Sequence, residues 1–163
     1  MEHENQEQKV KTPEEEQDYL AHRNAEEDRE QTLKDHSIET ARLAGKFAEE
    51  FGKGDWGKCC GMLHDIGKYS DAFQRRIRGK NNRKVDHSSA GAQLCLEKGG
   101  RYGFMSYCIA GHRAGLPDYG SRADPGSSPT LWGRRKKEVE DYHAYEKEIE
   151  IPEIHSDPVD LNK

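Results

Sequence analysis

An adjacent imidazole and carboxylate, His64 and Asp65, follow an apolar helical segment, and Gly67 and Lys68 come directly after them. Such a pair can bind one metal ion, and the carboxylate can also bridge two. Gly67 suits the left-handed conformation that ends many helices. Lys68 would then lie just past the helix end, within reach of an anionic substrate. The stretch predicts metal-dependent chemistry on an anionic group, provided that other segments supply further ligands.

Three more histidines stand near expected helix ends, each beside small or apolar residues: His36, His87 and His112. Imidazole and carboxylate without thiolate suit Mn, Fe, Co, Ni or Zn, and Mg is also compatible. A bound metal would activate water and offset negative charge on a phosphate. The sequence therefore predicts a site for one or two divalent ions, with the ligands His36, His64, Asp65, His87 and His112.

A single histidine on a half-apolar helix is more often a hydrogen-bonded core residue than a ligand. That simpler interpretation holds for His22, His143 and His155, which we leave out of the site. The cysteines lie in apolar helical contexts without the C-x-x-C spacing of a zinc site, which predicts reduced core residues. They are Cys59, Cys60, Cys95 and Cys108.

Helices must position these side chains. Hydrophobic periodicity predicts six helices, over residues 33–51, 55–65, 70–79, 87–98, 102–113 and 131–149. Asp55 is the expected N-cap of the second helix. The first helix is expected to bury one apolar stripe, made of Ile38, Ala41, Ala44, Phe47, Ala48 and Phe51. Residues 26–30 and 116–129 are expected as loops, and no strand pair is predicted, so the fold class is an all-α bundle.

Charge is distributed unevenly along the 163 residues, a length that fits one domain. Residues 1–30 hold eleven acidic and four basic side chains, although the whole chain has a net charge of only −5. We expect a disordered acidic extension over residues 1–18, a helical domain over 19–150 and a polar tail over 151–163. No apolar run reaches membrane-spanning length and no signal peptide is recognisable, so the cytoplasm is the expected location, without a membrane partner.

Two basic runs are candidates for contact with a phosphate backbone. The first lies between two ligand segments and supplies the predicted substrate contacts Arg75, Arg76, Arg78, Lys80, Arg83 and Lys84. A solvated surface explains it equally well. For the second run, residues 134–137, a solvated surface is the favoured interpretation. No row of aromatic residues indicates a platform for stacking bases.

Four segments together resemble the HD nuclease domain of the type I CRISPR helicase–nuclease, a branch of the HD phosphohydrolase superfamily. They are TLKDH at 32–36, HDIGK at 64–68, VDHSSAG at 85–91 and AGHRAGLPD at 110–118. The resemblance implies a helical HD fold that cleaves single-stranded DNA with two transition metals. It further implies that His36, His64 and Asp65 hold one metal, and that Asp65 bridges to a second metal held by His87 and His112.

The chain departs from this family pattern at two points. The family usually has two consecutive histidines where this chain has His112 and Arg113, so the second site is expected to lose a ligand and Arg113 to face substrate. A late aspartate of the family pattern is also missing after Tyr145, so the bundle is expected to lack its last helices. A truncated domain, a helix supplied by another polypeptide and a degenerate site would each explain this.

The primary hypothesis is a metal-dependent endonuclease or exonuclease of CRISPR antiviral defence, with Asp65 and Lys68 as catalytic residues. Because no G-x-x-x-x-G-K-[ST] motif is present, processive degradation would need a separate ATP-dependent helicase. The resemblance implies single-stranded DNA and a CRISPR effector complex as further partners. One alternative is a phosphohydrolase of nucleotides or cyclic nucleotides. The other is an inactive, truncated HD remnant or docking module.

Overall fold

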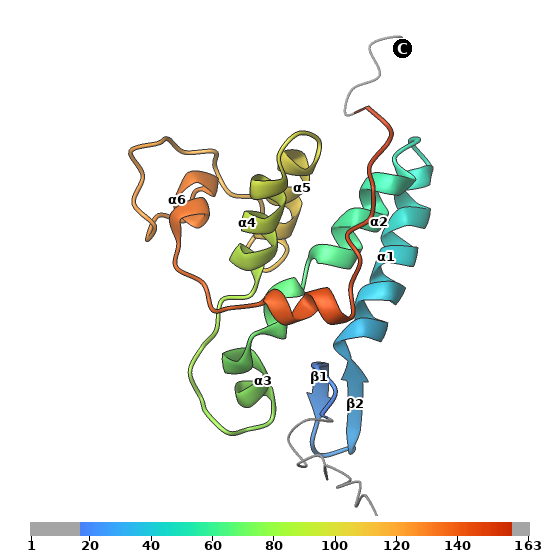
Figure 1. Cartoon of the computed structure of the whole chain (residues 1–163), viewed down its shortest axis with the longest axis vertical. Helices are drawn as coiled ribbons and strands as arrows, with labels where there is room; N and C mark the ends of the chain where they lie inside the picture. Colours follow the sequence, from blue (N-terminus) through green and yellow to red (C-terminus); the bar gives the residue numbers. More distant parts are fainter. Residues whose placement is uncertain (1–16, 158–163) are drawn as a thin grey trace, which may run out of the picture.

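The computed structural model describes residues 17–157. Two helix pairs form its body: α1 (Leu33–Glu49) packs on α2 (Gly54–Leu63), and α4 (Ser88–Lys98) packs on α5 (Tyr102–Gly111) (Figure 1). Within the described part, the sheet is a single two-stranded hairpin. The predicted all-α fold class is therefore confirmed.

Glycines let the helices approach closely enough to form the site. A Cβ on Gly61 of α2 would lie 2.6 Å from the Cα of Ala41 on α1. A Cβ on Gly91 of α4 would lie 2.6 Å from the carbonyl oxygen of Leu63, at the end of α2. No larger side chain fits at either contact, so these glycines bring the middle of α1, the end of α2 and the start of α4 together.

The apolar stripe predicted for α1 is only partly correct. Ala41 and Ala48 are buried, but Ile38, Phe47 and Phe51 are 46%, 68% and 70% exposed. The small residues face α2 because the close contact at Gly61 leaves no room for larger ones. Ile38 and Phe47 consequently lie on the exposed side of α1, and Phe51 follows the end of the helix.

A hairpin precedes α1, contrary to the prediction of no strands. Strand β1 (Leu20–Asn24) pairs antiparallel with β2 (Arg29–Thr32), with an irregularity between Leu20 and His22. The strands are short and mostly exposed, so they carry no apolar alternation that the sequence could reveal. Tertiary contacts stabilise them instead: Gln74 bonds to both the amide and the carbonyl of Leu20, at 2.9 and 3.0 Å.

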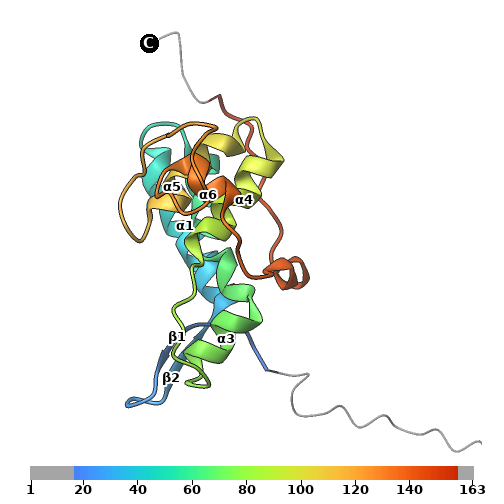
Figure 2. The same cartoon turned by 90° about the vertical axis from the view of Figure 1, so that its left-hand side faces the viewer.

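Gln74 belongs to α3 (Asp71–Ile77), which follows the short 3-10 helix η1 (Ile66–Tyr69). Figure 2 shows α3 and the hairpin together at one end of the molecule, with α4, α5 and α6 (Leu131–Lys136) towards the other. Ser70 caps α3 by accepting a hydrogen bond from the amide of Phe73 at 3.3 Å. The Thr32 hydroxyl likewise caps α1 by accepting from Asp35 at 3.2 Å.

The single helix predicted over residues 131–149 is wrong. It is replaced by α6, an extended link and the 3-10 helix η2 (His143–Lys147). The Gln93 side chain donates to the carbonyls of Arg134 and Lys137, at 2.7 and 2.6 Å. These bonds satisfy acceptors at the end of α6, where the backbone of Lys137 turns extended.

Residues 151–157 pack onto the domain, whereas a polar tail was expected from residue 151. Ile154 is buried, and the Trp56 indole donates to the carbonyl of Ser156 at 3.0 Å. The Asp55 carboxylate accepts from the Ser156 hydroxyl and from the amides of Ser156 and His155, at 2.6, 2.8 and 2.7 Å. Asp55 therefore anchors this segment from the first turn of α2, and it is not the N-cap. The acidic extension predicted up to residue 18 falls mainly outside the described residues.

Candidate metal centre

The Asp65 carboxylate lies at the centre of four imidazoles. Its Oδ2 is 3.1 Å from His36 Nε2 and 3.2 Å from His64 Nε2. Its Oδ1 is 3.3 Å from both His87 Nε2 and His112 Nε2. The five residues form two groups that share Asp65, and within each group the ligand atoms lie within 4.8 Å of one another. These are the two groups that the family resemblance implied.

Every ligand comes from the end of a helix. His36 lies in the first turn of α1, His64 is the C-cap of α2, and Asp65 directly precedes η1. His87 is the N-cap of α4, and His112 is the C-cap of α5. The close helix contacts at Gly61 and Gly91 therefore set the distances within the site.

Hydrogen bonds at the far side of two rings leave Nε2 available for a metal. His64 Nδ1 donates to the carbonyl of Gly61, and His112 Nδ1 donates to the carbonyl of Ile109, both at 2.7 Å. In each ring, the hydrogen bond at Nδ1 fixes the tautomer whose Nε2 carries a lone pair. His36 Nε2 and His64 Nε2 lie 3.2 Å apart, which matches two nitrogens on one ion at bonds of about 2.1 Å.

His87 supplies an independent test of fit. Its ring is buried, and neither nitrogen makes a hydrogen bond to any described residue. A buried imidazole without partners is unfavourable unless another group satisfies it. A cation beside Asp65 Oδ1 would do so, and the donor set of imidazoles and carboxylate fits a divalent transition metal.

The surroundings keep Asp65 ionised. Burial opposes its ionisation, but the close imidazoles of His112, His36, His64 and His87 outweigh burial and hold its pKa far below the usual value. Burial also disfavours the charged form of His64, yet its bond to Asp65 raises the pKa of this imidazole above normal. The centre therefore has a carboxylate charge at its middle, surrounded by four imidazoles.

Lys68 does not extend from a helix end towards substrate, as was expected. It is 4% exposed, and its Nζ lies 2.8 Å from Asp65 Oδ2 and donates to the carbonyl of Ala21 at 3.1 Å. Gly67 is not left-handed either, because the chain continues through η1. A Cβ there would lie 2.3 Å from the carbonyl oxygen of His87, so Gly67 is needed for close packing.

The first basic run surrounds two hollows beside α3. One, of about 350 Å³, is lined by Phe73, Arg76, Ile77, Asn81 and Asn82. Phe73 connects it to the centre, because its ring packs edge-on against the His87 ring with centroids 5.3 Å apart. Arg76 is thus the predicted substrate contact best placed near a ligand.

The other hollow, of about 570 Å³, includes Arg75, Arg78 and Lys80 in its lining. Arg78 is engaged structurally, since it donates to Gln74 Oε1 at 2.7 Å and also bonds to the carbonyl of Asp18. Arg83 pairs with Glu140 at 3.2 Å. Lys84 and Arg113 are exposed, the latter directly after His112.

Two members of the second basic run are structural, so a solvated surface was the wrong interpretation for them. Arg134 donates to the hydroxyls of Ser88 and Ser89, at 3.1 and 3.3 Å. Lys137 pairs with Asp86 at 2.5 Å, and Asp86 also accepts from the Ser89 amide at 3.1 Å. This network holds the start of α4, and with it His87.

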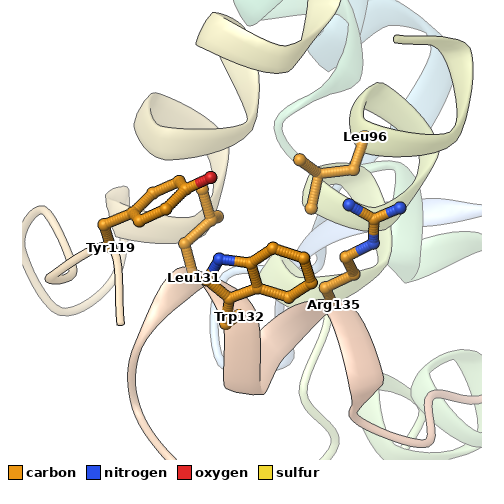
Figure 3. Close-up of a pocket in the computed structure, with 5 residues that line it drawn as sticks. All are labelled: Leu96, Tyr119, Leu131, Trp132 and Arg135. Carbon is orange, nitrogen blue, oxygen red and sulfur yellow. The ribbon is translucent and has the colours of Figure 1, made fainter. Parts of the chain in front are cut away.

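Two neighbourhoods were missed by sequence reasoning. The rings of His22 and His36 lie edge to face with centroids 4.9 Å apart, a contact made possible by the unpredicted hairpin. Figure 3 shows the other, a cavity of about 30 Å³ lined by Leu96, Tyr119, Leu131, Trp132 and Arg135. Arg135 lies over the Trp132 ring at 5.1 Å. None of the five metal-site residues lines this cavity.

Comparison with known proteins identifies the class. Residues 33–152 match the HD domain family, so this chain belongs to that family. HD domains bind divalent metals, and the chain carries the cluster that would hold them. Family and site together indicate a metal-dependent phosphohydrolase.

Three curated relatives are bacterial proteins named Ribonuclease Y. The protein from Rhodopirellula baltica is 40% identical over 67 residues, which are 34% of this chain and 13% of the relative. Those from Thermotoga petrophila and Thermotoga maritima are each 34% identical over 83 residues, 50% of this chain and 15% of the relative. The chain therefore spans only a small part of these relatives. Among the described residues, no helix is long and apolar enough to cross a membrane.

Proposed function

We propose that this HD domain hydrolyses phosphodiester bonds in single-stranded DNA, as the nuclease component of a CRISPR antiviral system. The observation that supports this most is the sharing of Asp65 between two pairs of histidines. A shared carboxylate suits two adjacent ions, the arrangement used by many enzymes that break phosphodiester bonds.

Each of the two ions would have its own pair of histidines and would share Asp65 with the other. His36 and His64 with Oδ2 of Asp65 would hold one ion, and His87 and His112 with Oδ1 would hold the other. Bound divalent metals lower the pKa of water and place positive charge near the phosphate. Lys68 is a positioning residue, because its contact with Asp65 Oδ2 fixes the carboxylate without reaching the substrate.

A path for the phosphate backbone runs from His87 over α3. Phe73 contacts His87 and also lines the hollow that contains Arg76 and the amide side chains of Asn81 and Asn82. Exposed cations at Arg75, Lys80 and Lys84 continue this surface. Such a surface binds by charge and shape, and its affinity should fall steeply with salt concentration.

DNA is favoured by the VDHSSAG and AGHRAGLPD segments, which resemble the CRISPR branch of the family. An ATP-dependent helicase and a CRISPR effector complex are the corresponding partners. RNA is the second candidate, because the similar curated proteins carry the name Ribonuclease Y.

Cleavage assays would separate these substrates. Linear and circular single-stranded DNA, RNA of the same sequence and a panel of linear and cyclic nucleotides would each be incubated with Mn²⁺, Ni²⁺ or Co²⁺. We expect both DNA forms to be cut, and His64→Ala to abolish cutting while leaving helix content unchanged. Preference for RNA would favour the second candidate, and activity on nucleotides alone would contradict any nuclease.

Metal content tests the alternative of an inactive remnant. After loading with Mn²⁺ and removal of free ion, we expect about one to two ions per chain. Less than about half an ion per chain would support the inactive remnant. In that case, Arg113 and the lack of the late aspartate would explain the loss of metal binding.

A further inference from the structure

Three aromatic rings that are distant in sequence form one aromatic cluster beside α5: Tyr107, Tyr119 and Trp132. The ring of Tyr119, from the loop between α5 and α6, stacks against Tyr107 of α5 with centroids 6.3 Å apart and planes inclined by 22°. It also meets Trp132 of α6 edge to face, with centroids 6.2 Å apart (Figure 3). Because two helices and a loop supply one ring each, the sequence shows no aromatic row.

The backbone holds Tyr119 in this cluster. The amide of Leu131 donates to the carbonyl of Asp118 at 2.9 Å, and the amide of Trp132 donates to the carbonyl of Tyr119 at 3.1 Å. Tyr119 is nevertheless 59% exposed. The adjoining cavity of about 30 Å³ has room for water but not for a nucleobase, so a flat ligand reaches only the exposed part of the ring. Tyr119 is therefore a fixed aromatic surface that is open to solvent.

Positive charge surrounds the aromatic cluster. The guanidinium carbons of Arg122 and Arg135 lie 5.7 and 5.1 Å from the centroid of the Trp132 ring. Both arginines are exposed, and neither forms an ion pair within the described part of the chain. Residues 113–137 hold six basic and two acidic side chains, in a chain whose net charge is −5. This charge favours a polyanion as the partner of the surface.

The aromatic cluster and a candidate metal ligand are carried by the same helix. Tyr107 precedes His112 by five residues, which is about 7.5 Å along the α5 axis at about 1.5 Å per residue. The loop after His112 folds back onto α5, since a Cβ on Gly111 would lie 3.0 Å from the Cα of Leu116. Tyr119 follows in this loop, so it is positioned against the helix that ends at His112.

We propose that Tyr119 stacks an unpaired nucleobase of the substrate strand, while Arg122 and Arg135 contact its phosphates. Aromatic rings beside a cationic surface are typical of proteins that bind single strands without sequence preference, because every base has a flat face. Trp132 orients the two guanidinium groups, and Tyr107 supports the ring of Tyr119. The inference rests on the proposed function, because it assigns a further contact to the same single-stranded substrate.

The first experiment measures binding of a fluorescein-labelled oligothymidylate to the metal-free full chain by anisotropy. Tyr119→Ala should weaken binding about tenfold, the effect of losing one stacked base, and Tyr119→Trp should bind like the parent. The dependence of affinity on salt should stay the same, because no charge is lost. Phe47→Ala is the matched control, since Phe47 is 68% exposed on α1 and lies outside the aromatic cluster. It should have no effect.

An abasic strand of the same length separates stacking from charge. It keeps the phosphates but has no bases, so the parent and Tyr119→Ala should bind it equally. Arg122→Gln/Arg135→Gln should weaken binding of both strands. It should also reduce the slope of log affinity against log salt by about 1.4, because each phosphate contact to a single strand contributes about 0.7.

Three results would overturn the inference. They are oligothymidylate binding by Tyr119→Ala that equals the parent's, an equal loss in Phe47→Ala, and an equal loss of Tyr119→Ala on the abasic strand. Aromatic and arginine side chains also anchor protein interfaces, so unchanged binding in every variant would favour a protein as the partner of this surface.

These measurements need neither metal nor cleavage, so they test the inference separately from the proposed function. A chain that binds single strands through Tyr119 but cuts none would contradict the proposed function and support the stacking contact. A chain that cuts single strands, while Tyr119→Ala binds them like the parent, would support the proposed function and overturn the stacking contact.

Discussion

The carbonyl oxygen of His87 lies so close to Gly67 that a Cβ there would approach it to 2.3 Å. The clash would be with backbone atoms, so Gly67→Ala must displace either η1 or the segment that carries His87. We predict that it lowers the affinity of the second metal about tenfold, with helix content unchanged. Titration with Mn²⁺ would measure this.

Gly103→Ala is the matched control, because a Cβ at Gly103 meets no atom within 4 Å. It should bind metal like the parent. If Gly67→Ala also binds like the parent, the packing of Gly67 on His87 does not position this ligand.

Asp65 and Lys68 form a buried ion pair whose members should depend on each other. Asp65→Asn removes the counter-charge of an ammonium that is 4% exposed, and breaking such a pair costs about 3 kcal/mol. Urea unfolding of the metal-free chain at pH 8 would measure the loss.

The double variant Asp65→Asn/Lys68→Met should regain much of that stability, because no unpaired charge then remains buried. Additive losses in the double variant would show that the two groups do not stabilise each other. Neither variant with asparagine at position 65 should retain two metals.

Asp55 should make the packing of residues 155–156 dependent on pH. Burial disfavours its charge slightly, but hydrogen bonds from Ser156, His155 and Trp56 lower its pKa to about 2. A carboxylate with a depressed folded-state pKa stabilises the fold fully above its unfolded pKa and loses this effect as pH falls. We expect Asp55→Ala to cost about 1 kcal/mol at pH 7, with the difference from the parent vanishing between about pH 4 and pH 2. Urea unfolding across that range measures it, and a constant difference would contradict the assignment.

Arg113 directly follows His112 and is exposed, and the CRISPR nucleases that this chain resembles usually have a second histidine at this point. Arg113→His should raise metal occupancy, because a neutral imidazole replaces a cation beside His112. Metal analysis after loading and gel filtration would test this, with Arg113→Gln as the control that removes charge without adding a ligand. If both variants gain equally, charge alone explains the effect.

The sequence was sufficient to predict which five side chains come together, because each stands at a helix end that glycine and capping residues mark. That these side chains bind metal stays a prediction. It was insufficient for the hairpin, since β1 and β2 depend on Gln74 and on burial of Leu20 instead of on their own pattern. It also misplaced Lys68, because the 3-10 helix η1 turns this side chain inward towards Asp65. The periodicity of apolar residues along the chain reflects local structure only, so it cannot predict such long-range contacts.

The second basic run shows the same limit. Arg134 and Lys137 look like surface charges in sequence, yet they bond to Ser88, Ser89 and Asp86 at the start of α4. The metal-site motif VDHSSAG contains those partners, but nothing in the spacing links it to a segment more than forty residues later.

The Lys68 bond to the Ala21 carbonyl, with the Gln74 bonds to Leu20, has a practical consequence for shortened versions of the chain. A fragment cut at residue 33, where the family match begins, would remove the Ala21 carbonyl from Lys68 and both backbone partners at Leu20 from Gln74. Lys68 would keep only its pair with Asp65, and the Gln74 amide only its bond to the Lys68 carbonyl. Expression boundaries should therefore start upstream of Tyr19, even though residues 19–32 supply none of the five candidate ligands.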